Sequence, residues 1–261
     1  MPLIDHITRP LLPDHYYHVF NRGNMENNIF FREENYRYFL MKYKQYMVDY
    51  WDTYAYALIP NHFHLAIRVK SEEAVLGAAV RDLKVLRKDK WERMLWGTGD
   101  LTVLRELSNL ARGQGRPTPP RLDQVIPLLT PAQRTDLAAW AVSECFRRFL
   151  LGYAKAINKQ ERPKPRYGSL MQKPFRRKPV GDEGHLRRLI AYIHRNGVHH
   201  GYVNSIEDYP HSSYHTMLTT TPTSVVRNKV LELFGGVEGF LRFHGTMPLD
   251  GYAGEDFVIE E

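Results

Sequence analysis

The chain has 261 residues, 43% hydrophobic and 12% aromatic, enough to bury a core in one domain or in one domain with a large insertion. Its single cysteine, Cys145, excludes an intramolecular disulfide and a Cys-rich zinc site, and apolar neighbours predict that it packs in the core. No run approaches the ~18 apolar residues of a membrane span, and the N-terminus lacks a signal-peptide layout. We therefore expect a soluble, cytoplasmic protein without a membrane partner.

The formal charge of +7 is concentrated in one segment. Between residues 147 and 178, eleven Lys or Arg stand against one acid, Glu161. A block of this kind is often only a solvated face. Here Tyr153, Tyr167 and Phe175 are interleaved with the cations, and charge combined with stacking rings is what single-stranded nucleic acid requires. The composition therefore favours a nucleic-acid partner.

The first part of the chain predicts a strand, a helix and two further strands. Residues 15–21 are aromatic and β-branched and stop at a glycine turn. Residues 33–50 carry apolar groups at helical spacing. Residues 52–59 and 62–69 read as two strands joined by a tight Pro-Asn connection.

The remaining chain is less regular. Residues 71–138 predict short helices and a loop, which we interpret as a mostly helical insertion. Beyond it we expect two more helices with an extended or hairpin segment between them, and an acidic, loose C-terminal tail. The expected elements are helices within 75–96 and 101–110, a loop at 113–121, a helix at 137–158, the extended segment at 168–180 and a helix at 183–199 that ends at Asn196-Gly197.

Two histidines mark the strand expected at 62–69. Side chains alternate along a strand, so His62 and His64 project from one face, about 7 Å apart, while Phe63 and Leu65 face the core. From there both imidazoles can reach one divalent ion. A pair of this kind also arises by chance or for packing, since the chain has twelve histidines.

Tyr192 and Asn196 mark the helix expected at 183–199. Leu186, Leu189, Ile190 and Ile193 form its buried stripe. Tyr192 and Asn196 flank the stripe four residues apart, on the same edge of the helix. They can bring a phenolic nucleophile and an amide-oxygen ligand to one point. The alternative interpretation is a boundary tyrosine and an asparagine at the helix end.

Five segments occur in the order and with the character of the REP-associated tyrosine transposases, within the single-tyrosine HUH transposase family. The chain resembles these proteins over roughly residues 15–70 and 140–217. The combination of PNHFH with a later YIHRN is the most specific part of the resemblance. The segments are YYHVFNRGN (16–24), PNHFHLAI (60–67), GSLMQKPFRRK (168–178), YIHRNGV (192–198) and DYPHSSY (208–214).

The resemblance implies an activity: Mg²⁺- or Mn²⁺-dependent nicking and strand transfer of single-stranded DNA, with a hairpin expected in the substrate. By position, His62, His64 and Asn196 would bind the metal, and Tyr192 would attack the scissile phosphate to form a 5′-phosphotyrosine. A monomer or homodimer is expected, associated with the nucleoid when bound to DNA. Where the family usually has proline after the asparagine, this chain has Gly197, which also ends helices.

The resemblance also implies an α+β fold: a ferredoxin-like antiparallel sheet with helices on one face and the histidine strand central, plus the helical insertion. The transposase domain would be discontinuous, formed by residues 1–70 and 139–217. The insertion would span 71–138, and a C-terminal extension would span 218–261.

Further candidates are weaker. DNA contacts are predicted for seven basic or amide residues, and packing is favoured over metal contact for His18. His194 points about 200° around the helix from Tyr192, which argues against a ligand role, and His199 and His200 are expected at the surface. The predicted DNA-contact residues are Asn21, Arg22, Arg166, Lys173, Arg176, Arg177 and Lys178.

Two alternative functions remain open from the sequence. The first is a domesticated, non-catalytic protein that binds DNA hairpins. The second is a metal-dependent phosphodiesterase that uses the two histidines and water, with Tyr192 in a structural role. A covalent protein–DNA adduct would distinguish the proposed activity from both.

Overall fold

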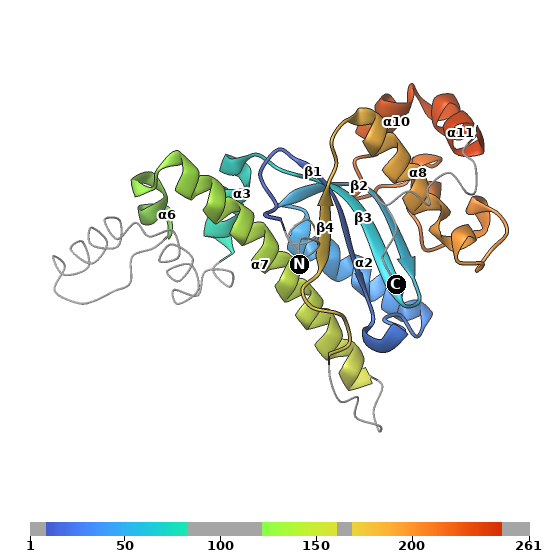
Figure 1. Ribbon diagram of the computed structural model, residues 1–261, viewed down its shortest axis with the longest axis horizontal. Coiled ribbons are helices and arrows are strands. Elements are labelled where there is room, and N and C mark those ends of the chain that lie inside the picture. Colours follow the sequence, from blue (N-terminus) through green and yellow to red (C-terminus); the bar gives the residue numbers. More distant parts are fainter. Residues whose placement is uncertain (1–8, 83–121, 161–168, 247–261) are drawn as a thin grey trace, which may run out of the picture.

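The computed structural model describes residues 9–82, 122–160 and 169–246 (Figure 1). The strands are β1 (Tyr16–Arg22), β2 (Trp51–Ile59), β3 (His62–Val69) and β4 (Arg176–Pro179). The helices are α2 (Glu33–Met47), α3 (Glu72–Arg81), α6 (Leu122–Val125), α7 (Pro131–Gln160), α8 (Glu183–His199), α9 (Tyr214–Met217), α10 (Arg227–Phe234) and α11 (Val237–Thr246). Short 3₁₀ turns are η1 (Asn24–Glu26), η2 (Ile126–Leu128) and η3 (Ile206–Asp208).

The strands form one antiparallel sheet in the order β2-β3-β1-β4. The strand that carries the two histidines, β3, is therefore internal, as expected. The edge strand β4 comes from the segment predicted to be extended, and it pairs with β1. The α+β class and the antiparallel sheet are confirmed.

Helices cover both faces of the sheet, so the expectation of helices on one face was wrong (Figure 1). On the first face, Phe63 and the alternate residues of β3 pack in a large core with Phe39 of α2 and Phe146 of α7. On the second, the predicted stripe of α8 packs on Ala57 and Ala66. These small side chains let a helix approach the sheet closely, and an amphipathic helix requires an apolar surface of this kind.

The first core continues into the region predicted as an insertion. Val75 of α3 and Val125 of α6 belong to the same core as the sheet, and α3 packs against α7. Of the helix expected within 75–96, α3 covers only the start. The rest of it, the helix at 101–110 and the whole loop at 113–121 lie outside the described residues. The domain boundaries at residues 70 and 138 stay predictions.

Helix α7 begins earlier than its apolar pattern suggests. Thr130 and Gln133 form a reciprocal cap: the Gln133 amide donates to Thr130 Oγ1 at 3.3 Å, and the Thr130 amide donates to Gln133 Oε1 at 2.9 Å. Pro131 occupies the first helical position, where its missing N–H costs nothing. The sequence Thr-Pro-Ala-Gln is a start signal that apolar periodicity alone did not include. Cys145, on the same helix, is buried as expected.

The C-terminal helices α10 and α11 dock beside α8 in the second core. Buried hydrogen bonds join α8 to α11 and to Ser213: His194 Nε2 lies 2.8 Å from Ser213 Oγ, and His194 Nδ1 lies 2.9 Å from His244 Nε2 of α11. His244 Nδ1 in turn lies 2.8 Å from the Phe240 carbonyl oxygen. His194 therefore packs on the side of α8 that faces away from the two β3 histidines. No helix in the part of the chain that the structure describes is long and apolar enough to cross a membrane.

Helix α8 covers the predicted residues 183–199, and Asn196-Gly197, expected to end it, lies in its last turn. Gly197 is needed for packing instead. A Cβ atom there would lie 2.4 Å from Cγ of Tyr209, and the Tyr209 hydroxyl is fixed by a 2.7 Å hydrogen bond to the Leu58 carbonyl. The glycine lets the tyrosine ring pack directly against the helix backbone.

Replacing Gly197 by alanine is therefore expected to destabilise the fold by about 1–3 kcal/mol, the usual cost of overpacking a core. Chemical denaturation measures this free energy of unfolding. Gly181→Ala is the matched control, because a Cβ atom at that position would meet nothing within 4 Å. Equal stability of the two variants would contradict the packing role.

Candidate functional site

The pleat of the sheet turns both β3 histidines toward α8. His62 is opposite Arg22 and His64 is opposite Phe20 in the antiparallel pairing with β1. Both imidazoles are buried, although polar side chains are expected at a protein surface. Their burial on an internal strand calls for hydrogen-bond partners or a bound ligand.

Tyr192 and Asn196 of α8 lie directly above these histidines. Asn196 Oδ1 is 3.5 Å from His62 Nε2, the outer limit of a hydrogen bond. The Tyr192 ring is perpendicular to the His64 ring, with centroids 5.5 Å apart. The Asn196 side chain also donates to the Tyr192 carbonyl oxygen at 3.0 Å. All four residues predicted for catalysis and metal binding therefore converge.

Each β3 histidine has its Nδ1 atom engaged away from α8. His62 Nδ1 lies 2.7 Å from Asn61 Oδ1, and His64 Nδ1 lies 2.7 Å from Nε2 of His18 on β1. The Nε2 atom of His64 is buried without a hydrogen-bond partner among the described residues. Partners of this kind fix the tautomer and the ring orientation of metal-binding histidines.

The histidines of the site are neutral at physiological pH. Burial, with smaller effects of neighbouring cationic groups, lowers the pKa of His18 to about 3. Burial, followed by the charge of His200, lowers the pKa of His62 to about 3, and burial also holds the pKa of His64 well below its usual value. A neutral imidazole is the form that binds a metal, so no proton has to be displaced first.

Burial has the opposite effect on the tyrosine because its charged form is the deprotonated one. It raises the pKa of Tyr192 to about 12, and a hydrogen bond with Asn196 opposes this increase. In the free protein Tyr192 is therefore a neutral phenol.

The donor set fits a divalent ion. Among the described residues, no group of three or more His, Cys, Asp or Glu side chains is placed to hold one. The candidate set has instead two imidazole nitrogens, one of them the unpartnered Nε2 atom of His64, and the Asn196 amide oxygen. Nitrogen and oxygen donors without thiolate suit Mn²⁺ or Mg²⁺, and two imidazoles also suit zinc.

Two histidines near the site were not predicted to belong to it. His18 is buried, as predicted. It also orients His64 through the contact between His18 Nε2 and His64 Nδ1. His200 is exposed, as expected, yet its ring centroid lies 4.6 Å from that of His62. His18, Phe20 and Arg22 lie on the same face of β1, and the alternation of side chains along a strand makes this visible in the sequence. The contact of His18 with His64 depends on the register between β1 and β3, which the sequence pattern does not give.

The basic triplet on β4 divides between the two faces of the sheet. Arg176 and Lys178 are opposite Phe20 and His18, on the face that carries the site. Arg177 points to the other face, where its guanidinium lies 4.7 Å from the Phe175 ring centroid and donates to the Arg9 carbonyl oxygen at 2.6 Å. Of the triplet, Arg176 and Lys178 therefore lie on the face that carries the site, and Arg177 does not.

The other residues predicted to contact DNA also lie on different faces of the sheet. Arg22 shares the site face, because it is opposite His62. Asn21 points to the other face and is buried; its amide donates to the Gln172 carbonyl at 3.1 Å and its oxygen accepts from the Arg22 amide at 2.9 Å. This hydrogen bonding gives Asn21 a structural role in fixing the segment before β4. Lys173 is exposed on that segment, and Arg166 lies outside the described residues.

The contact between His18 and His64 gives a test of metal binding. His18→Ala removes the partner of His64 Nδ1, so the affinity for Mn²⁺ is expected to fall about 10- to 100-fold, the usual effect of losing such a partner. Isothermal titration with Mn²⁺ measures this. His15→Ala, which changes an exposed histidine just before β1, is the control. Wild-type affinity in the His18 variant would show that packing is its only role.

The sequence matches no protein-family model and no curated protein. Among solved structures, the chain is similar to a REP-associated tyrosine transposase bound to a REP hairpin, at 13% identity and a TM-score of 0.43, covering 82% of this chain and 86% of that chain. A similarity at this level carries no argument about function, which is argued below from the site.

Proposed function

We propose that this protein is a metal-dependent, single-tyrosine endonuclease and strand transferase for single-stranded DNA. The observation that carries the proposal is the convergence of Tyr192 and Asn196 on His62 and His64, with both Nδ1 atoms engaged elsewhere. A phenol beside two imidazoles and an amide oxygen supports the proposal, in accordance with the family resemblance of the motifs.

The reaction exchanges one phosphodiester for another. The Tyr192 oxygen attacks the scissile phosphorus, the bond to the 3′-oxygen breaks, and that oxygen takes up a proton to leave a 3′-hydroxyl. The 5′-phosphate stays on the tyrosine. A second 3′-hydroxyl can then attack this phosphotyrosine and release the phenol, which joins a new strand without ATP because the bond energy is conserved.

The residues of the site divide this work. His62, His64 and Asn196 would hold Mg²⁺ or Mn²⁺, which supplies positive charge that favours the phenolate and polarises the phosphate. Asn196 also contacts the helix turn that carries Tyr192, so the nucleophile and the donor set are held together. His18 keeps the His64 ring in place. Pre-set positions of this kind lower the entropic cost of reaction.

Cations on the same face support a DNA substrate. Arg22, Arg176 and Lys178 project on the site side of β1 and β4. They can neutralise phosphates of a strand that passes over the edge of the sheet toward Tyr192. A hairpin in the substrate is part of the proposal by resemblance, as is association with the nucleoid.

The test is a suicide oligonucleotide in which the fragment upstream (5′) of the cleavage site is short. This fragment carries the new 3′-hydroxyl, and because it dissociates after cleavage the strand cannot be religated. Incubation with Mn²⁺ should trap a covalent adduct, seen as a shifted protein band whose peptide map places the DNA on Tyr192. Binding without any cleavage would support a non-catalytic hairpin-binding protein instead. Cleavage without an adduct would support a phosphodiesterase that uses water.

Because Arg176 and Lys178 lie on the site face and Arg177 on the other, we expect them to contribute unequally to DNA binding. Replacing Arg176 and Lys178 by alanine should weaken binding to unrelated single strands and reduce the slope of log affinity against log salt by up to ~0.7 per lost contact. Arg177→Ala should reduce the slope less, because this guanidinium lies on the other face and is held by the Arg9 carbonyl. Titrations of labelled DNA at several salt concentrations measure this, and equal slopes for all variants would contradict the phosphate path.

A further inference from the structure

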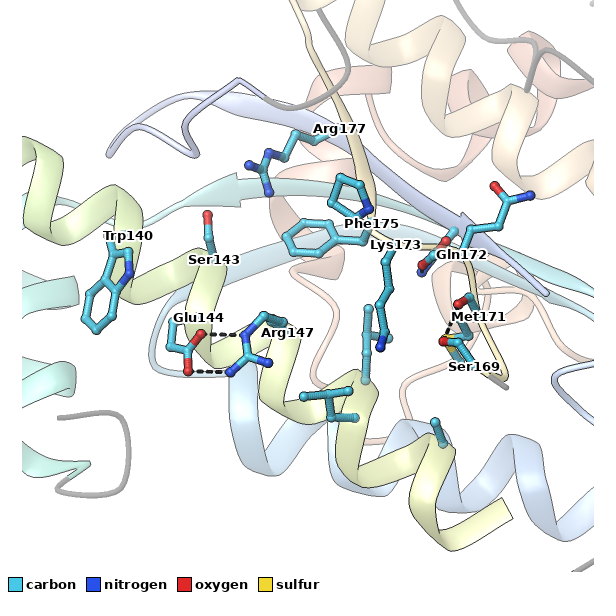
Figure 2. Close-up of a pocket in the computed structure, with 15 residues that line it drawn as sticks. Trp140, Ser143, Glu144, Arg147, Ser169, Met171, Gln172, Lys173, Phe175 and Arg177 are labelled. Carbon is cyan, nitrogen blue, oxygen red and sulfur yellow. Dashed lines mark hydrogen bonds and ion pairs between the residues drawn. The ribbon is translucent and has the colours of Figure 1, made fainter. Parts of the chain in front are cut away.

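A groove of about 590 Å³ lies on the face of the sheet opposite the site, between α7 and the segment that leads into β4 (Figure 2). Its size is that of a small-ligand pocket. One wall is formed by Trp140 and Leu151 of α7, and the other by Phe175 and Arg177. Figure 2 shows Trp140, Phe175 and Arg177 among the residues that line the groove.

The α7 wall of the groove holds a carboxylate. Both oxygens of Glu144 accept hydrogen bonds from Arg147, each at 2.6 Å, although the Glu144 side chain is only 8% exposed (Figure 2). Glu144 is therefore a buried carboxylate that lines the groove and is held in place by Arg147. Ser143 adds a hydroxyl on the same wall.

The surroundings of the groove are basic. Lys173 and Arg147 line it and are exposed, and they belong to the segment from residue 147 to residue 178 that has eleven cations and one acid. A polyanion is the complementary partner for such a surface. Apolar and aromatic walls beneath a cationic rim also suit a base whose phosphates remain at the surface.

The edge strand connects the groove to the catalytic face. Arg176 and Lys178 point to the site, and Arg177 between them forms part of the groove. Because β4 is the edge of the sheet, a single strand that crosses it meets both faces within a few nucleotides.

We infer that this groove binds one unpaired nucleobase of the single-stranded DNA substrate, with a preference for bases that carry an amino group. This inference rests on the proposed function. An amino group donates to the Glu144 carboxylate, the contact that acidic side chains make with cytosine N4. Thymine has no amino group and leaves the carboxylate without that hydrogen bond.

The test compares twelve-nucleotide homopolymers of deoxycytidine and thymidine, because the two pyrimidines are similar in size. Fluorescence anisotropy with the full chain should give about fivefold to tenfold tighter binding of the cytidine strand. Glu144→Gln should abolish this preference, since an amide can donate as well as accept. Ser143→Trp, which fills the groove and leaves Glu144 in place, should weaken binding of the cytidine strand to the level of the thymidine strand.

Asp136→Asn is the matched control, because it neutralises an exposed acid on the same helix outside the groove. Melting curves establish that each variant is folded. The inference is overturned if the Glu144 and Ser143 variants bind both strands as the Asp136 variant does. It is also overturned if free cytidine monophosphate binds in the groove without competing with DNA, which would indicate a small-molecule site.

Failure of this inference differs from failure of the proposed function. If the suicide oligonucleotide forms an adduct on Tyr192 while both groove variants bind DNA normally, only the base pocket is wrong. If no adduct forms and the cytidine preference persists, the groove binds a base and the proposed catalysis is wrong.

Discussion

Tyr192→Phe is expected to lower DNA cleavage by at least about a thousandfold while DNA affinity stays within a factor of two or so, because only the attacking oxygen is removed. The ring remains to pack against His64 and His18. Denaturing gels of a labelled strand measure cleavage, and anisotropy measures binding. The covalent adduct should disappear in the same variant.

Tyr202→Phe is the matched control, since it removes a hydroxyl from an exposed tyrosine just after α8. It should cleave and bind like the wild-type protein. A Tyr192→Phe protein that still forms the adduct would refute the assignment of the nucleophile, and equal loss of binding and cleavage would assign Tyr192 to DNA binding or folding instead.

Changing His64 to alanine is expected to reduce metal-dependent cleavage by more than about a hundredfold, because one imidazole and an amide make a weak site for a divalent ion. The effect should exceed that of losing His18, which only supports a metal-binding residue. His62→Ala should have the same effect. Removal of metal from the wild-type protein with EDTA should match both variants, and excess Mn²⁺ should restore only part of the activity of each.

His199→Ala controls for the loss of any imidazole near the end of α8, because His199 is exposed. It should keep full activity and its metal dependence. Full cleavage by the His62 or His64 variant in EDTA would rule out the metal role, and the Mn²⁺ titration would then show no difference between these variants and the control.

Local patterns in the sequence determined much of the fold. Alternation from His62 to Val69 predicted a strand with Phe63 facing the core, and the 3.6-residue periodicity predicted α8 and its buried stripe. The four-residue spacing of Tyr192 and Asn196 predicted a shared helix edge. Each of these relations lies within one segment, where backbone geometry fixes the spacing of side chains.

The relations between segments were decided only by the tertiary structure. The contact of His18 with His64 and the division of Arg176 from Arg177 depend on strand register, which long-range pairing sets. The covering of the second face depends on where α8 docks, and the need for glycine at position 197 depends on the packing of the Tyr209 ring. The sequence by itself determined the reactive groups and their local spacing, whereas packing between distant segments decided which of them meet.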